Sequence, residues 1–340
     1  MGIDNLIRPG SHLNVAPLKQ MGAEVIHGDI RIATDLETLP KVDWVLDCAA
    51  NASVLAGVDG KTSSRQLVEH NLLGSINLLE YCRKHQAGFT LLSTSRVYSI
   101  PPLVNLPLKV DSQNGKNRFT PDLNHQELGT DNQQQITANG LKETFSTQAP
   151  VSLYGATKLA SEQLALEYGY TYDFPVWINR CGVMAGAGQF GHPAQGIFAY
   201  WIHSFAEGKP LKYIGFDGKG RQVRDCLHPK DLLPLIEKQF NNQQQTTNNK
   251  QQRIINCAGG ASNSMSLAEL TDWCNDRFKT NFEPQHDPQD RLFDIPWMIL
   301  DSTLAKEVWD WAPVTSLTEV CQNIADFAEE NLDWLRQSQA

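Results

Sequence analysis

The sequence predicts an α/β fold built on a parallel sheet, and two observations carry this prediction. In roughly the first 100 residues, short β-branched runs alternate with helical stretches, an alternation that is typical of βαβ units. The length of 340 residues fits two domains, or one large domain, at the usual size of about 100–200 residues. The first part of the chain is therefore expected to form the sheet.

Five short apolar segments are expected as its strands. The second of them runs into Cys48, Ala49 and Ala50, and the third runs into a cluster of hydroxyl side chains, Ser93, Thr94 and Ser95. Ligands of open α/β sheets bind at the carboxyl ends of strands, so these sequences are candidate site residues. The expected strands are 24–27, 43–47, 88–92, 176–179 and 253–256.

Helices are expected between these strands and in the C-terminal part. Apolar residues at helical spacing give residues 64–84 a single apolar stripe, formed by Leu67, Leu72, Ile76 and Leu79. Residues 152–168 form a second strongly helical segment, and two more helices are expected near 266–278 and 315–337.

Two stretches lack this periodicity. Residues 101–150 are rich in Pro, Asn, Gln and Thr, which predicts a long irregular insertion or lid. Residues 241–252 are almost entirely Asn, Gln and Thr, which predicts a solvated loop before the last strand.

The composition excludes several classes of function. The 29 basic and 38 acidic side chains give a formal charge of −9, which argues against a nucleic-acid-binding surface. No apolar run approaches the ~20 residues that cross a bilayer, so no membrane association is expected. The seven cysteines are widely spaced, without a C-x-x-C pair, so we expect reduced thiols, no metal site and a cytoplasmic location without a leader peptide.

Tyr154 and Lys158 are the strongest chemical signal. They lie four residues apart, so they project from the same face of a helix, about one turn apart. A nearby ammonium favours the phenolate and lowers the pKa of a tyrosine, which turns the phenol into a usable base. Alone, such a pair is also common on helix surfaces by chance.

Together with the hydroxyl cluster, this pair resembles the Ser/Thr–Tyr–Lys arrangement of the extended short-chain dehydrogenases/reductases. The chain is similar to their NAD-dependent epimerase/dehydratase branch along nearly its whole length. The runs that carry the resemblance are Asp4-Asn-Leu-Ile-Arg8-Pro-Gly10, His27-Gly-Asp29-Ile30-Arg31, Ala49-Ala50, Asn71 with Gly74, Leu92-Ser-Thr-Ser-Arg-Val-Tyr98, Gln222-Val-Arg224-Asp225, His228-Pro-Lys-Asp231, Asn256-Cys-Ala-Gly-Gly260 with Asn263, and Asp290-Arg291.

The resemblance implies a Rossmann-type doubly wound parallel sheet and a smaller C-terminal substrate-binding domain. The NAD-binding domain would span 1–180, with 220–260 returning to it, and the substrate domain would comprise 181–219 and 261–340. A homodimer through the helices around 64–84 and 152–168 is implied as well.

The resemblance also assigns a cofactor site for NAD. Asp4 would accept hydrogen bonds from the adenosine ribose, a contact that a 2′-phosphate would repel, although so early a residue could also be a solvated terminus. Asp29 and Ile30 would hold the adenine, unless Asp29 is only a turn or cap residue. The remaining cofactor-binding residues that the matching runs assign are Asn5, Arg8, Ala49, Ala50, Asn71, Tyr154 and Lys158.

The catalytic set implied by the resemblance is Thr94, Tyr154 and Lys158. Tyr154 would be the base, Lys158 would lower its pKa and anchor the nicotinamide ribose, and Thr94 would bind the reacting oxygen. The diphosphate of a nucleotide-sugar substrate would be gripped by forked contacts from guanidinium groups. The substrate-binding residues are Gln189, Arg224 and Arg291, although arginines are also common in surface ion pairs.

The implied activity is NAD-dependent epimerisation of a nucleotide-activated sugar through a transient keto sugar. Dehydratases of the branch carry Asp-Glu directly after the catalytic Ser/Thr, and this chain has Ser95 and Arg96 there, which favours an epimerase. Inversion at C2 is preferred, with 4-epimerisation or simple reduction as the alternatives. Outside enzymes, a non-catalytic sensor or partner-binding protein and an RNA-associated relative stay open.

The largest departure from the family pattern is at the N-terminus. Members open with a strand, a Gly-x-x-Gly-x-x-Gly turn and a helix that bind the cofactor diphosphate. Here Gly2-Ile3-Asp4 matches the end of the second strand, so the first βα unit, on the order of 30 residues, is expected to be absent. Either the start codon was assigned too late or the chain is truncated, and we expect poor NAD binding and exposed sheet edges.

Overall fold

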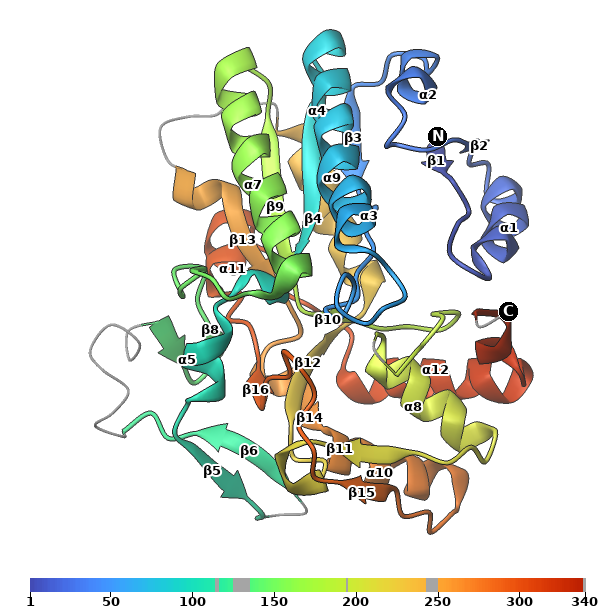
Figure 1. Cartoon of the computed structure of the whole chain (residues 1–340), viewed down its shortest axis with the longest axis vertical. Helices are drawn as coiled ribbons and strands as arrows, with labels where there is room; N and C mark the ends of the chain where they lie inside the picture. Colours follow the sequence, from blue (N-terminus) through green and yellow to red (C-terminus); the bar gives the residue numbers. More distant parts are fainter. Residues whose placement is uncertain (114–115, 125–134, 194, 243–249, 339–340) are drawn as a thin grey trace.

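The computed structural model describes residues 1–113, 116–124, 135–193, 195–242 and 250–338 (Figure 1). Its main sheet has four parallel strands in the order β13-β9-β4-β3. The bounds are β3 Trp44–Asp47, β4 Gly88–Thr94, β9 Val176–Cys181 and β13 Ile254–Cys257. These four expected strands are confirmed, with bounds that differ by two residues at most.

Helices cover both faces of this sheet, as a doubly wound fold requires. Successive strand residues point to opposite faces. On β9, Ile178 packs into the core beneath α4 (Gly74–His85) and α7 (Ser152–Tyr172). Its neighbour Trp177 packs on the other face, against residues of α9 (Leu233–Asn241) and α11 (Thr303–Trp309).

The helix expected over 64–84 is confirmed, as one helical run that contains a π-helical turn. It begins as α3 (Ser64–Val68), with Ser63 as its N-cap, widens into a π-helical turn over Glu69–Leu73, and continues as α4. The π turn places Asn71 in the interior, where it is fully buried. Such turns occur frequently at functional sites, and periodicity alone does not reveal them.

The first two strands stand apart from the main sheet. β1 (Gly2–Asp4) pairs in parallel with β2 (Val25–His27), and in the described residues this pair has no ladder to β3. Figure 1 shows β1 and β2 at the right of the view, beyond β3. The expected open edge is therefore present, and β3 has one partner strand, β4, in the described part of the chain.

A second sheet lies at the carboxyl end of the first. β12 (Val223–Leu227) pairs with β10 (Val183–Met184), β14 (Ser264–Ser266) and β16 (Trp297–Met298). The segment 220–260 thus divides between the two sheets, because β12 joins this one and β13 joins the main one. A large apolar core packs the second sheet against α8 (Ile197–Ala206), α10 (Leu267–Phe278) and α12 (Leu317–Glu330). The parallel pair β11 (Lys212–Ile214) and β15 (Gln285–Asp287) flanks it.

The described parts of the segment 101–150, which leave out 114–115 and 125–134, contain short regular elements that the sequence did not predict. They are α5 (Ile100–Val104) and two hairpins, β5–β6 (Leu108–Asp111 and Arg118–Pro121) and β7–β8 (Ile136–Thr137 and Gly140–Leu141). The hairpins are held by distant residues: Arg118 forms an ion pair with Glu269, and Leu141 bridges to Leu300. Such long-range partners are invisible to local sequence patterns, which explains why these short elements were not predicted.

The segment 241–252 lies partly outside the described residues, since 243–249 are not described. Where the structure describes the chain, none of its helices combines the length and apolar character that a membrane span requires.

Candidate active site

A pocket of about 330 Å³ lies between the two sheets, at the carboxyl ends of β4 and β9. Its lining brings together five of the predicted residues from widely separated segments. Thr94 ends β4, and Tyr154 belongs to the first turn of α7. The other three come from the substrate half of the chain: Gln189, Arg224 and Arg291.

A close helix–turn contact places Tyr154 beside Thr94. A Cβ atom added at Gly155 would lie 2.3 Å from the carbonyl oxygen of Arg96, so the helix start packs directly on the 3₁₀ turn Ser95–Val97 that follows β4. Thr94 caps this turn by accepting the Arg96 N–H at 3.2 Å. Ser152 in turn accepts the Gly155 N–H at 3.1 Å. The phenol is thus fixed from both elements.

Burial and three neighbouring side chains set the ionisation of Tyr154. Burial raises the pKa of the phenol above its usual value, and a hydrogen bond with the Thr94 side chain lowers it again. The Cys181 thiol acts to raise this pKa and the Arg96 guanidinium acts to lower it. Lys158 is not among these influences, so the expected direct effect of its charge on the phenol is not seen in the described part of the chain.

Lys158 is nevertheless placed as a buried cation next to the pocket. Only 1% of the residue is exposed, and within the described residues its ammonium forms no hydrogen bond or ion pair. Its charge acts to lower the pKa of two thiols, those of Cys48 after β3 and Cys181 at the end of β9. A buried, unpaired ammonium is costly, and a ribose hydroxyl is a ligand that would satisfy it. This environment fits the predicted anchor of a nicotinamide ribose.

A buried ion pair fixes α7 against the sheet one turn beyond Lys158. Glu162 accepts three hydrogen bonds from Arg180 of β9, the shortest at 2.7 Å, and one from Ser93 of β4 at 2.5 Å. Both charged side chains are at least 95% buried. Since Tyr154, Lys158 and Glu162 lie on one face of α7, this anchor also sets the register of the two predicted catalytic residues.

The two predicted substrate arginines share one carboxylate. Asp294 accepts a hydrogen bond from Arg224 at 3.1 Å and lies 3.5 Å from Arg291. Arg291 also donates to the Pro193 carbonyl at 3.2 Å, and Arg224 donates to its own neighbour's carbonyl at Val223. The shared carboxylate therefore holds the two guanidinium groups close together in the lining of the pocket.

Gln189 offers an acceptor to the same pocket. Its Nε2 donates to the Met184 carbonyl at 3.0 Å, which orients the amide, while its buried Oε1 has no partner among the described residues. A buried acceptor without a partner is costly, so a donor on a bound ligand would stabilise it.

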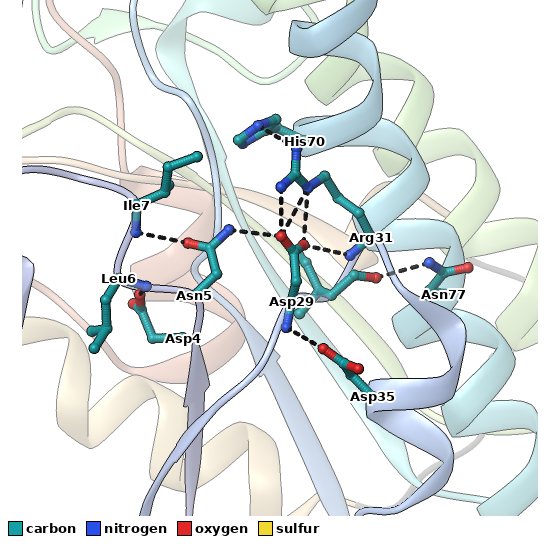
Figure 2. Close-up of polar contacts among 10 residues, drawn as sticks. Asp4, Asn5, Leu6, Ile7, Asp29, Arg31, Asp35, His70 and Asn77 are labelled. Carbon is teal, nitrogen blue, oxygen red and sulfur yellow. Dashed lines mark hydrogen bonds and ion pairs between the residues drawn. The ribbon is translucent and has the colours of Figure 1, made fainter.

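The predicted adenosine end lies on the β1–β2 pair (Figure 2). Asp4 is exposed at the end of β1, and its carboxylate accepts the Leu6 N–H at 2.7 Å. The Asn5 side chain accepts the Ile7 N–H through its carbonyl oxygen and donates through its amide nitrogen to the Asp29 carboxylate at 3.0 Å. Asp4 therefore keeps free acceptor positions for a ribose.

Asp29 is more tightly engaged than predicted. Arg31 donates to both of its carboxylate oxygens, with a closest approach of 2.5 Å, and these hydrogen bonds hold the pKa of Asp29 well below its usual value. Arg31 also meets His70 at 2.8 Å. Figure 2 shows Arg31 between these two side chains. An adenine would therefore meet an ion pair here rather than a free carboxylate.

The other predicted cofactor residues have mainly local partners. The side-chain amide of Asn71 accepts the Asn51 N–H and donates to the Asn51 carbonyl and to the Thr157 hydroxyl. These hydrogen bonds connect the loop after β3 to α7. Ile30 packs against Gly74, and Arg8 donates to the Phe190 carbonyl at 2.8 Å. Ala49 and Ala50 are exposed after β3, so the backbone there is open to a ligand.

A sequence model described as the NAD dependent epimerase/dehydratase family matches residues 1–258. The chain belongs to this family. Its members are NAD-dependent enzymes that act on nucleotide sugars, and the family match covers the strand-end hydroxyls, the Tyr154–Lys158 helix and Arg224 together.

Relatives in the family are similar at low identity. CDP-paratose 2-epimerase of Salmonella typhi is 27% identical over 337 residues, covering 95% of this chain and 90% of that protein. UDP-glucuronate 4-epimerase 4 of Arabidopsis thaliana is 23% identical over 314 residues, covering 89% of this chain and 62% of that protein. The crystal structure of UDP-glucuronic acid 4-epimerase from Bacillus cereus, in complex with UDP-glucuronic acid and NAD, has a TM-score of 0.69 at 20% identity and covers 97% of this chain and 90% of that chain. This last likeness supports the Rossmann-type fold.

Sequence reasoning missed three residues of the site. Asp294 is not recognisable in the sequence, because its role depends on two arginines far apart in the chain. Arg31 lies in a run that matches the family, but the resemblance assigns it no role. Arg96 differs from the acidic residue of the dehydratases, and its position directly after the hydroxyl cluster is a usable signal.

Proposed function

We propose that the chain epimerises a nucleotide-activated sugar, with inversion at C2 of a CDP-linked sugar as the preferred reaction. The observation that carries this proposal is the hydrogen-bonded pair of Thr94 and Tyr154 in a pocket whose opposite rim carries Arg224 and Arg291. The two residues that follow Thr94 in the pocket are Ser95 and Arg96, so neither position supplies a carboxylate that could act in a dehydration.

Each residue has a definite task in this reaction. Tyr154 as phenolate takes the proton of the sugar hydroxyl and returns it when the hydroxyl re-forms, so no net proton is consumed. Thr94 holds the reacting oxygen through its hydroxyl. Arg224 and Arg291 bind the diphosphate and leave the sugar free to turn between two faces. Gln189 offers its unpartnered carbonyl oxygen to a donor on the substrate.

The cofactor of the family fits the residues that are present at both of its ends. NAD, when bound, supplies a reversible hydride acceptor that is regenerated in each cycle. Lys158 would hold the nicotinamide ribose and Asp4 the adenosine ribose. The backbone after β3, at Ala49 and Ala50, would face the middle of the cofactor.

The test is turnover by Tyr154→Phe, assayed with NAD on CDP-, UDP- and dTDP-linked sugars by NMR of the products. We expect wild-type protein to invert one centre and Tyr154→Phe to lose at least about 100-fold in rate, with an unchanged circular dichroism spectrum. Retained activity in Tyr154→Phe would defeat the proposal.

The alternative within enzymes is 4-epimerisation, or simple reduction, of another nucleotide sugar. It is supported by the similarity to UDP-glucuronate 4-epimerases, which is of the same order as that to the CDP-paratose enzyme. The same assay separates the two, since the position of the inverted centre is read directly from the proton couplings of the product.

A non-catalytic role for the NAD fold is the second alternative. It is favoured by the separation of β1–β2 from β3, which share no ladder in the described residues. Calorimetric titration with NAD decides it: binding without turnover of any sugar favours a sensor.

We further propose that the chain forms a homodimer through the helices around 64–84 and 152–168, in a reduced cytoplasmic setting. Sedimentation analysis tests the dimer.

A further inference from the structure

Arg96 is a pocket cation that the reaction above does not use. It lies in the 3₁₀ turn after β4, and its backbone is fixed at both sides: its N–H binds Thr94 Oγ1 at 3.2 Å, and its carbonyl packs on Gly155. Arg96 therefore contacts Thr94, which ends β4, and Gly155, which follows Tyr154 on α7.

The guanidinium of Arg96 crosses the pocket to the substrate half of the chain. It donates to the Phe293 carbonyl at 3.3 Å and lines the same pocket as Tyr154. Unlike Arg224 and Arg291, which share Asp294, it forms no ion pair in the described part of the chain. Its charge therefore stays available to a group inside the pocket.

Burial and a neighbouring positive charge destabilise the charged form of this guanidinium. Burial and the nearby charge of Arg224 lower the pKa of Arg96 to about 10, while Asp294 and Tyr154 act in the opposite direction. A partly exposed cation whose pKa is lowered in this way is stabilised by a negative charge that forms beside it. The phenolate of Tyr154 is such a charge.

We propose that Arg96 is a positioning residue for Tyr154: from the sugar side of the pocket it stabilises the phenolate that the proposed epimerisation needs. This inference rests on the proposed function. In the described part of the chain, Arg96 is then the cation that acts on the phenol, whereas the charge of Lys158 on α7 is not among the influences on it. The replacement of an acidic residue by Arg96 then supplies a charge that favours proton abstraction, besides removing a group for dehydration.

The other charged and titratable groups around the phenol are accounted for. Cys181 faces it from β9 and disfavours its ionisation, whereas Arg96 favours it. Across the pocket, Arg224, Arg291 and Asp294 form their own cluster.

The experiment is direct titration of Tyr154 in the full chain without substrate. Biosynthetic labelling with difluorotyrosine brings phenol ionisation into a range where the protein stays folded, and the ¹⁹F resonance of residue 154 is assigned with Tyr154→Phe. Arg96→Gln removes the charge but keeps an N–H that can reach the Phe293 carbonyl, and Arg96→Met is the second variant if Arg96→Gln does not fold. Arg96→Lys keeps the charge.

We expect the pKa of this phenol to rise by about one unit or more in Arg96→Gln, a tenfold smaller phenolate fraction at a given pH, and to stay near wild type in Arg96→Lys. Arg291→Gln is the matched control, since it removes a pocket guanidinium that does not act on the phenol, and should leave the titration unchanged. An unchanged titration in Arg96→Gln, or an equal rise in Arg96→Lys, would overturn the inference.

The two proposals fail separately in this design. The titration requires no turnover, so a phenol that responds to Arg96 in a protein without epimerase activity refutes the function and leaves the electrostatic link intact. Where turnover is present, the acid limb of kcat against pH should move upward in Arg96→Gln.

Discussion

The catalytic end and the adenosine end of the site hold their polar side chains in different ways. Around Tyr154, an arginine–carboxylate pair, Arg180–Glu162, has side chains that are 5% and 0% exposed and ties α7 to two strands of the main sheet. At β1–β2, the pair Arg31–Asp29 has the same chemistry, but its side chains are 27% and 12% exposed. The catalytic end is embedded in a core, whereas the adenosine end lies on two strands that have no ladder to the main sheet in the described residues.

This difference shows that one kind of interaction has two roles, set by burial. A buried pair contributes chiefly by leaving no charge unpaired in the interior, so breaking it is costly. A partly exposed pair orients side chains at modest cost. The geometry of Tyr154 is therefore expected to be robust, while the adenosine end depends on local contacts.

Breaking the two pairs should give the largest difference. Glu162→Gln leaves Arg180 buried without a countercharge and should lower the free energy of unfolding by about 3–5 kcal/mol. Asp29→Asn should lower it by about 1 kcal/mol or less. Urea denaturation of both variants measures the contrast, and equal losses would show that burial does not separate the two ends.

Filling the contact between α7 and the 3₁₀ turn is expected to cost somewhat less. Gly155→Ala places a Cβ 2.3 Å from the Arg96 carbonyl, so the helix start must move away from Thr94, at a cost of about 1–3 kcal/mol. Turnover should fall more than substrate affinity, because the phenol is displaced. Leu153→Ala, on an exposed neighbour, is the control, and a similar loss in both would disprove the role of the contact.

A pH-dependent loss of stability should arise away from the site, at His203 of α8. Burial lowers the pKa of this imidazole to about 4, and neither ring nitrogen has a partner among the described residues. The folded state therefore favours neutral His203, and this contribution is full above the unfolded pKa near 6.5 and is lost as pH falls towards 4. His203→Phe should raise stability at pH 5 on the order of 2 kcal/mol and change it less at pH 8. Thermal melts at both pH values test this, and an equal gain at both would contradict it.

The smallest effect is expected from Asp4→Asn at the exposed adenosine end. One solvent-accessible hydrogen bond contributes about 1 kcal/mol, so NAD affinity in calorimetry should fall about fivefold. Lys158→Met, which removes a buried anchor, should weaken NAD more. A larger loss of NAD affinity in Asp4→Asn than in Lys158→Met would contradict this expectation, because the dominant cofactor contact would then lie on β1.

Local sequence patterns predicted the main sheet and the helix that carries Tyr154 and Lys158, because buried strands and helices leave short-range periodicity. They missed the short elements of the segment 101–150, whose order depends on partners such as Glu269 and Leu300 more than 140 residues away. The same reason hid Asp294, which matters only through Arg224 and Arg291. Residue roles such as those of Thr94 and Arg224 came from resemblance to the family, not from spacing.

The central claim is that Tyr154 starts a reversible oxidation of a nucleotide sugar. The most direct measurement is proton NMR of the sugar product formed in D₂O with NAD. The account predicts an inverted centre that keeps its own hydrogen, no deuterium at that carbon, and no product with Tyr154→Phe. Deuterium at the inverted carbon, or product formation by Tyr154→Phe, would contradict it.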